Sequence, residues 1–244
     1  MIVRPYRNEL KYSIHYSARE LLLSRWQRYV VKAAHTNENG VSPVLSQYFD
    51  SPDLVFIREK SEGLRFRNKV RLRVYAQNFE KGQLAFLEIK RRHNDLVKKV
   101  RQKIPNLDPE FHLDPKNWTF DNPEAASAYN ELRERHRLRP SAQTYYQREA
   151  YEGLVENDVR ITFDSHLIGL HPGERLTGKV LRDRSRSLMP DTVIILELKS
   201  TKGFPGWIYE GIRLAELRQQ PIPKYTSSAK VLKLRSLFEV GNYL

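Results

Sequence analysis

Basic side chains alternate with aliphatic ones near the middle of the chain, and this spacing suits the binding of phosphate. In Lys69-Val-Arg71-Leu-Arg73-Val-Tyr75 the odd positions are basic or aromatic and the even positions are aliphatic. Side chains two residues apart share a face of a strand. The planar guanidinium group of arginine can bond two phosphate oxygens at once. The stretch therefore predicts a strand that buries one face and presents a row of cations on the other.

The same alternation recurs in other stretches of the chain. Charged residues share inferred strand faces at Glu9 and Lys11, at Glu88 and Lys90, at Lys99, Arg101 and Lys103, at Arg160, Thr162 and Asp164, and at Glu197 and Lys199. Each stretch alone fits an ordinary sheet with a solvated charged face. Amphipathic helices need an apolar surface, however, and the aliphatic strand faces supply it. The charged faces would then line the inside of a barrel, where confined cations need an anion.

Four acidic residues lie among these cations, and two readings of them stay open. They are Glu9, Glu88, Asp164 and Glu197. Each can neutralise a neighbouring lysine or arginine. Phosphoryl chemistry on a nucleotide also commonly uses Mg²⁺ or Mn²⁺ held by carboxylate oxygens. We expect Glu197 to be the main metal ligand, with Glu88 and Glu9 as the next candidates.

The predicted elements favour the α+β class. Strands are expected at residues 9–14, 44–50, 69–76, 85–92, 97–104, 144–151, 159–164 and 193–199. Helices are expected at 17–34, with Ser17 and Glu20 as a capping box, and at 123–137, 206–217 and 227–238, and residues 169–190 are expected to be mostly loop. Strands joined by short connections predict an antiparallel sheet, and about eight strands can close around one ligand. We predict a closed antiparallel β-barrel, a tunnel with flanking helices, in one domain over residues 1–244.

The composition narrows the partners and the compartment. Forty-two lysines and arginines face 29 aspartates and glutamates, which leaves a formal charge of +13 and implies a polyanionic partner. Nucleic acid is not the expected one, since the sequence has no helix-turn-helix, zinc-finger or RNP-type motif. The chain has no cysteine, no signal peptide and no apolar run of the roughly 18 to 20 residues that a membrane span needs. We therefore expect a cytoplasmic protein without a transmembrane segment.

Seven stretches, in order along the chain, form a recognisable set. They are Arg7-Asn-Glu9-Leu-Lys11-Tyr12, Ser46-Gln-Tyr48-Phe49-Asp50, Lys69-Val-Arg71-Leu-Arg73-Val-Tyr75, Phe86-Leu-Glu88-Ile-Lys90, Tyr146-Gln-Arg148-Glu-Ala-Tyr151, Val159-Arg160-Ile-Thr162-Phe-Asp164 and Leu196-Glu197-Leu-Lys199. Together they resemble the VTC domain family, the catalytic domain of polyphosphate polymerases in the triphosphate tunnel superfamily, which includes stand-alone bacterial members. The resemblance covers nearly the whole chain.

This resemblance implies a polyphosphate polymerase that uses ATP and polyphosphate, with Mn²⁺ or Mg²⁺ as cofactor. The residues expected to act in the transfer are Arg71, Arg73, Lys90, Arg148, Arg160 and Lys199. Those expected to bind further phosphates are Lys11, Lys69, Lys99, Arg101, Tyr146, Lys224 and Lys230. The implied metal ligands are Glu197, Glu88 and Glu9. Where the family typically has K-[FY]-S-K after the last strand, this chain has Lys224-Tyr225-Thr226-Ser227, and Lys230 comes further on.

Two other functions stay open beside the polymerase. One is a tunnel phosphohydrolase that acts on triphosphate or a nucleotide, and the other is a polyphosphate-binding module without catalysis. Many tunnel triphosphatases open with E-x-E-x-K, but here Arg7 stands at the first glutamate position. A cation at that position favours the holding of a long anion over a metal-rich hydrolase. No partner protein is predicted.

Overall fold

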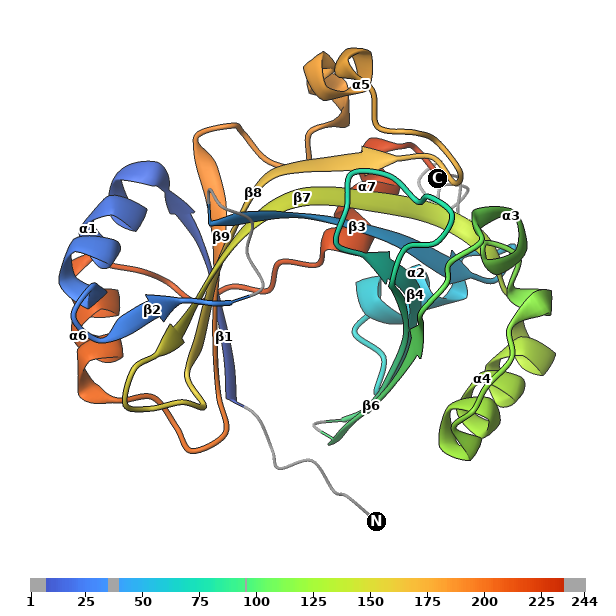
Figure 1. Cartoon of the computed structure of the whole chain (residues 1–244), viewed down its shortest axis with the longest axis horizontal. Helices are drawn as coiled ribbons and strands as arrows, with labels where there is room; N and C mark the ends of the chain where they lie inside the picture. The colour runs from blue at the N-terminus through green and yellow to red at the C-terminus, as the bar shows by residue number, and fades with distance from the viewer. Residues whose placement is uncertain (1–7, 35–39, 95, 235–244) are drawn as a thin grey trace, which may run out of the picture. The chain divides into compact units, whose positions relative to one another are not determined.

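The computed structural model describes residues 8–34, 40–94 and 96–234 (Figure 1). Backbone contacts divide the chain into two compact units, each made of three segments. Unit 1 comprises residues 1–43, 146–167 and 189–223, and unit 2 comprises residues 44–145, 168–188 and 224–244. The single domain over residues 1–244 stays a prediction.

The described residues form an antiparallel sheet of nine strands. The strands are β1 (Asn8–His15), β2 (Val30–Lys32), β3 (Val41–Asp50), β4 (Phe66–Val74), β5 (Ala85–His93), β6 (Leu96–Ile104), β7 (Arg139–Gly153), β8 (Arg160–Leu170) and β9 (Val193–Ser200). Their hydrogen-bonded order is β1-β9-β8-β7-β3-β4-β5-β6, with β2 paired to β7. The α+β class and the antiparallel sheet are therefore confirmed. Within the described residues no pairing joins β1 to β6, so the closed barrel is not confirmed.

Seven α-helices accompany the sheet in the described part of the chain. They are α1 (Tyr16–Trp26), α2 (Val55–Ser61), α3 (Pro109–His112), α4 (Pro123–His136), α5 (Gly178–Arg182), α6 (Gly206–Leu214) and α7 (Lys224–Val231). None of the helices described is both long enough and apolar enough to span a membrane.

In unit 1, α1 and α6 cover the aliphatic face of β1, β8 and β9 (Figure 1). Leu22 and Trp26 of α1 and Ile208 of α6 pack with alternate residues of the strands, which include Leu196. The two helices approach closely at Gly211, where an added Cβ would lie 2.5 Å from the Trp26 indole nitrogen. Because the aliphatic positions are covered, the charged positions between them lie on the other face.

In unit 2, α4 covers the aliphatic face of β5 and β6 (Figure 1). Its Tyr129 and Leu132 join a core that contains Ile89 and Val100. The helix begins after Asn122, whose side chain accepts a hydrogen bond from the Glu124 amide, and proline occupies its first turn. The cationic positions of these strands again lie on the opposite face.

The first predicted helix is shorter than expected. It ends at Trp26, and Val30–Lys32 instead forms β2 and pairs with β7. Two consecutive valines fit a strand better than a helix, because branching at Cβ restricts helical side chains. The predicted cap is also wrong, since His15 is the N-cap and its ring accepts a hydrogen bond from the Ser17 amide.

Other boundaries differ in the same way. The last helix begins at Lys224 instead of residue 227, and its predicted end at residue 238 lies outside the described residues. Helix α2 was not predicted. Its first turn is held by Asp50, whose carboxylate accepts from the Phe56 amide at 2.9 Å and the Ile57 amide at 3.2 Å. The predicted loop at 169–190 contains the end of β8 and α5.

Candidate functional site

Unit 1 carries a cluster of charged side chains on the sheet face opposite α1 and α6. The strand register sets Lys11 directly across from Glu197 and Glu9 across from Lys199. The Lys11 Nζ lies 2.6 Å from a Glu9 oxygen and 3.3 Å from a Glu197 oxygen. The Lys199 Nζ lies 3.0 Å from the same Glu197 oxygen. These four residues, with Arg148 and Asp164, are called the Glu197 cluster below.

Arg148 is held rigidly within this cluster. Its Nε and one terminal nitrogen donate to the two oxygens of the fully buried Asp164 at 2.6 and 2.7 Å. Its other contacts are Glu197, 3.7 Å away, and the ring of Tyr146, whose centroid lies 5.2 Å from the guanidinium carbon. A paired hydrogen bond of this kind fixes the plane of the guanidinium group.

The electrostatics keep Glu197 ionised. Burial raises the pKa of Glu197, but the positive charges of Lys199, Lys11 and Arg148 outweigh burial and hold that pKa well below 4.5. Burial lowers the pKa of Lys199, an effect that Glu197 partly offsets. The cluster thus contains a buried carboxylate whose charge depends on the cations around it.

The donors in unit 1 suit a divalent metal only in part. Glu9 and Glu197 come from neighbouring strands, and both contact the Lys11 ammonium group. Magnesium is commonly bound by one or two carboxylates together with substrate phosphates. Among the described residues no group of three or more acids or histidines could hold a metal ion. The pair therefore fits an ion whose remaining ligands come from phosphate and water.

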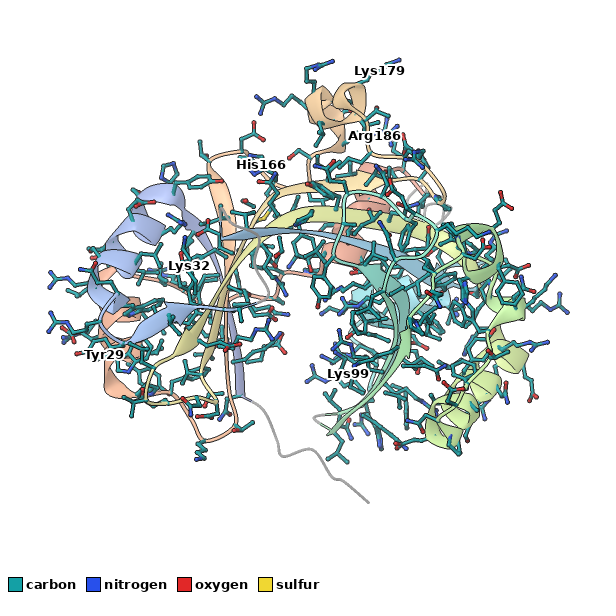
Figure 2. All side chains as sticks on the ribbon, viewed as in Figure 1. Tyr29, Lys32, Lys99, His166, Lys179 and Arg186 are labelled. Carbon is teal, nitrogen blue, oxygen red and sulfur yellow. The ribbon has the colours of Figure 1, made fainter. Side chains whose placement is uncertain are left out.

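Unit 2 carries a second cluster, centred on Glu88. The register aligns Arg71, Glu88 and Arg101 across β4, β5 and β6. Arg71 donates to one Glu88 oxygen at 2.7 Å, and the Lys99 Nζ lies 2.5 Å from the other. Arg101 lies 3.6 Å from Glu88, and Figure 2 shows Lys99 projecting from the side of the strands turned away from α4. Together with Arg73 these residues are called the Glu88 cluster.

Glu88 is the shared counter-ion of this cluster. Burial raises the pKa of Glu88, but Arg71, Arg73 and Lys99 outweigh burial and hold it far below 4.5. Burial also lowers the pKa of Lys99, and the negative charge of Glu88, which raises that pKa, does not fully offset burial. With three cations already around it, Glu88 fits the role of internal counter-ion better than that of metal ligand.

Tyr48 lies beneath the cations of unit 2. It is directly opposite Arg71 in the sheet, and the Lys69 Nζ lies 5.8 Å from its ring centroid. Burial raises the pKa of Tyr48, but Arg71, Lys69 and Arg73 reverse this effect and lower the pKa to about 7. The phenol is therefore electrostatically part of the cationic face, although its side chain is almost wholly buried.

Helix α7 is anchored to the same region of unit 2. The Tyr225 ring stacks on Tyr48, with centroids 4.5 Å apart. Its hydroxyl donates to Asp50 at 2.8 Å and lies 2.7 Å from the Ser141 hydroxyl. Lys224 therefore starts a helix whose second residue is fixed to β3.

The predicted site residues thus fall into two sets. Those in unit 1 are Glu9, Lys11, Tyr146, Arg148, Arg160, Glu197 and Lys199. Those in unit 2 are Lys69, Arg71, Arg73, Glu88, Lys90, Lys99, Arg101, Lys224 and Lys230. Arg160 lies across from Lys199, and Lys90 lies across from both Lys69 and Lys99. Lys230 is exposed on α7 and makes no ion pair within the described residues. The roles of all these residues stay predictions.

Sequence reasoning assigned no role to Tyr48, Asp50 or Tyr225. A signal was available for the first two, because they stand two residues apart in the predicted strand and so share a face. The link to Tyr225 depends on the docking of a segment that lies 175 residues from Asp50, which no local pattern shows.

Comparisons with known proteins agree with this arrangement. Residues 6–233 match the family model of the VTC domain. A candidate adenylate cyclase from Bacillus halodurans has a similar structure, with a TM-score of 0.52 and 14% identity over 93% of this chain and 96% of that chain. At this identity the likeness shows the fold alone.

Two other solved structures are less similar to this chain, with TM-scores below 0.5. A Pyrococcus horikoshii protein gives a TM-score of 0.47 and 15% identity, covering 94% of this chain and 100% of that chain. A mimivirus capping enzyme triphosphatase gives a TM-score of 0.36 and 14% identity, covering 84% of this chain and 86% of that chain. No curated protein matches the chain.

Proposed function

The chain belongs to the VTC domain family, and on this premise we propose that it is an ATP-dependent polyphosphate polymerase. A terminal oxygen of the growing chain forms a bond to the γ-phosphorus of ATP while the bond to the bridging oxygen breaks, and ADP leaves. The closed tunnel of the triphosphate tunnel superfamily is part of this proposal. So is a cytoplasmic location, since ATP is the substrate.

One observation carries the proposal. A single carboxylate, Glu88, stands among nine cations on one face of β4, β5 and β6. The cations are Arg67, Lys69, Arg71, Arg73, Lys90, Arg92, Lys99, Arg101 and Lys103. Such an excess of positive charge on one surface favours a ligand with several negative charges at close spacing. A phosphate chain has this property.

The roles of the residues follow from charge and geometry. Phosphoryl transfer needs little covalent help from the protein, so positioning and charge neutralisation supply most of the catalysis. Arg148 presents a guanidinium plane fixed by Asp164, which suits a phosphate in one orientation. Arg71 and Lys99 balance the charge of Glu88 until an anion binds.

A divalent cation fits this proposal at Glu197 and Glu9. When bound, Mg²⁺ or Mn²⁺ would neutralise charge on the transferred phosphoryl group. Lys11 and Lys199, which contact Glu197, hold that carboxylate in its charged form. Glu197→Gln should therefore abolish activity while most polyphosphate binding is retained.

The test uses the purified full chain with ATP and Mn²⁺, and it measures both long-chain polyphosphate and orthophosphate. Arg160→Ala is the informative variant, because Arg160 makes no ion pair within the described residues and its loss should leave the fold intact. We expect chain growth in the wild type and at least a tenfold loss in Arg160→Ala, corresponding to about 1.4 kcal/mol. Arg135→Ala, on the exposed surface of α4, is the matched control.

The other functions give different results in the same assay. Orthophosphate release without chain growth would identify a phosphohydrolase. Salt-dependent polyphosphate binding without turnover, unchanged by Glu197→Gln, would identify a binding module. Stronger binding of duplex DNA than of polyphosphate would contradict all three.

A further inference from the structure

An apolar row protrudes from one end of β4, β5 and β6. Phe66, His93 and Leu96 are aligned across the three strands. Phe66 is 62% exposed and Leu96 is 75% exposed. The rings of Phe66 and His93 stack with centroids 4.1 Å apart, so the row has a defined arrangement. Val97, which is 49% exposed, belongs to the opposite face of the same strands.

This row lies beyond the region that α4 covers. Two ion pairs tie α4 to the strands, from Arg91 to Glu131 and from Lys98 to Glu124. Further along the same face, Val100 is buried in the core. Helix α4 therefore covers this face as far as the two ion pairs, and the apolar side chains beyond them are exposed to solvent.

The surroundings of the row are strongly basic. Residues 64–69 and 90–99 contain eight basic residues and one acidic residue, Asp95, and two of the basic residues, Arg91 and Lys98, pair with Glu131 and Glu124 of α4. The basic residues are Arg65, Arg67, Lys69, Lys90, Arg91, Arg92, Lys98 and Lys99. Leu64, which is 43% exposed, adds to the apolar side chains in this segment. Large exposed apolar groups within a cationic rim mark an interaction surface.

We propose that this end of the strands, formed by residues 64–69, 90–94 and 96–99, docks on an anionic lipid surface. Apolar side chains enter the boundary between headgroups and acyl chains, while lysines and arginines pair with lipid phosphates. A phosphate chain alone would not use the apolar row, since phosphate binding draws on cations. A groove on a protein partner would contact one face, whereas Leu96 and Val97 leave the strand on opposite faces.

The test uses sedimentation of the full chain with vesicles of phosphatidylcholine, alone or mixed with phosphatidylglycerol. We expect binding to the mixed vesicles only. The double variant Phe66→Ser with Leu96→Ser keeps every charge and should bind about tenfold more weakly. Val155→Ser, at an 84% exposed position of unit 1, is the matched control and should bind as the wild type does.

A spectroscopic measurement separates insertion from simple charge attraction. The chain has no cysteine, so Leu96→Cys can carry a single environment-sensitive fluorophore. Its emission should shift to the blue with mixed vesicles, whereas the same label at Val155→Cys should not respond. Equal vesicle binding by the double variant, or an unshifted label at position 96, would overturn the proposal. Self-association or DNA binding that the double variant loses, without any lipid binding, would overturn it too.

Discussion

Arg71 donates from Nε to Oε2 of Glu88, 2.7 Å away, from the directly opposite position on the neighbouring strand. Lys99 occupies the other oxygen at 2.5 Å. Both oxygens of the carboxylate are therefore engaged by cations of the face that we propose binds phosphate. A polyanion bound to these cations would neutralise part of the positive charge that Glu88 neutralises in the free protein. Ligand binding should therefore be coupled to the stability of unit 2.

This coupling predicts the behaviour of Glu88→Gln. Loss of the charge leaves Arg71, Lys99 and Arg101 without their counter-ion. The free energy of unfolding should fall by about 1–3 kcal/mol, less than for a fully buried pair because the cations are partly exposed. Added polyphosphate should restore most of this loss. Urea denaturation with and without polyphosphate measures both effects.

Glu131→Gln is the matched control for this experiment. Glu131 pairs with Arg91 at a more exposed position, so its loss should change stability by less than about 1 kcal/mol, with no rescue by polyphosphate. A Glu88→Gln protein as stable as the wild type, or one that polyphosphate does not stabilise, would contradict the counter-ion role.

Acid should weaken the fold through Glu88 and Glu197. The pKa of each is held below its ordinary value of 4.5 in the folded chain. Such groups contribute stability that is full above pH 4.5 and is lost as the pH falls through their folded pKa values. The free energy of unfolding, followed by urea denaturation, should therefore decrease below pH 4.5, and less steeply in Glu88→Gln.

Much of the fold follows from the period-two pattern of the strands. Lys69, Arg71 and Arg73 stand on one face because the aliphatic residues between them are covered, and the sequence is sufficient to predict that. Short connections likewise predict antiparallel pairing. The predicted closure of the barrel is not confirmed within the described residues, because it needs a pairing between β1 and β6 that no local pattern specifies.

The charged clusters were predicted less completely than the strands. Which acid meets which cation depends on register, and a one-residue slip would move Glu88 away from Arg71. The part played by Tyr225 needs a contact between α7 and Asp50, so it is invisible to any window of sequence. The predicted end of the first helix was wrong because Val30 pairs with Gly153 of β7, and this tertiary contact outweighs the helical pattern.

The anchor of α7 makes a prediction of its own. Tyr225→Phe keeps the ring that stacks on Tyr48 but removes the hydrogen bond to Asp50 and the contact with Ser141. The free energy of unfolding, measured by urea denaturation, should fall by about 1–3 kcal/mol, because the buried Asp50 carboxylate loses a hydrogen-bond donor. Tyr209→Phe, at a position 54% exposed, should change stability by no more than about 0.5 kcal/mol. Equal losses in the two variants would show that the Tyr225 hydroxyl does not anchor the helix.

The ionisation of Tyr48 should depend on the positive charge of the cationic face of β4, β5 and β6. Burial would raise its pKa, but Arg71, Lys69 and Arg73 lower it from 10.0 to about 7. A depressed pKa contributes stability that is full above pH 10.0 and is lost as the pH falls through about 7. The wild type should therefore gain stability over Tyr48→Phe as the pH rises from 7 to 10.

The ultraviolet absorbance of tyrosinate measures the same group without unfolding the chain. A single tyrosine should ionise near pH 7 in the wild type and not in Tyr48→Phe. Polyphosphate should move this ionisation to higher pH, because an anion that neutralises Arg71 and Lys69 removes the cause of the low pKa. Tyr225→Phe is the control for loss of a buried tyrosine, since burial and Asp50 hold the pKa of Tyr225 well above 10.0. Identical titrations of the wild type and Tyr48→Phe would mean that the cations do not act on Tyr48. A titration of Tyr48 that polyphosphate leaves in place would mean that the anion binds elsewhere.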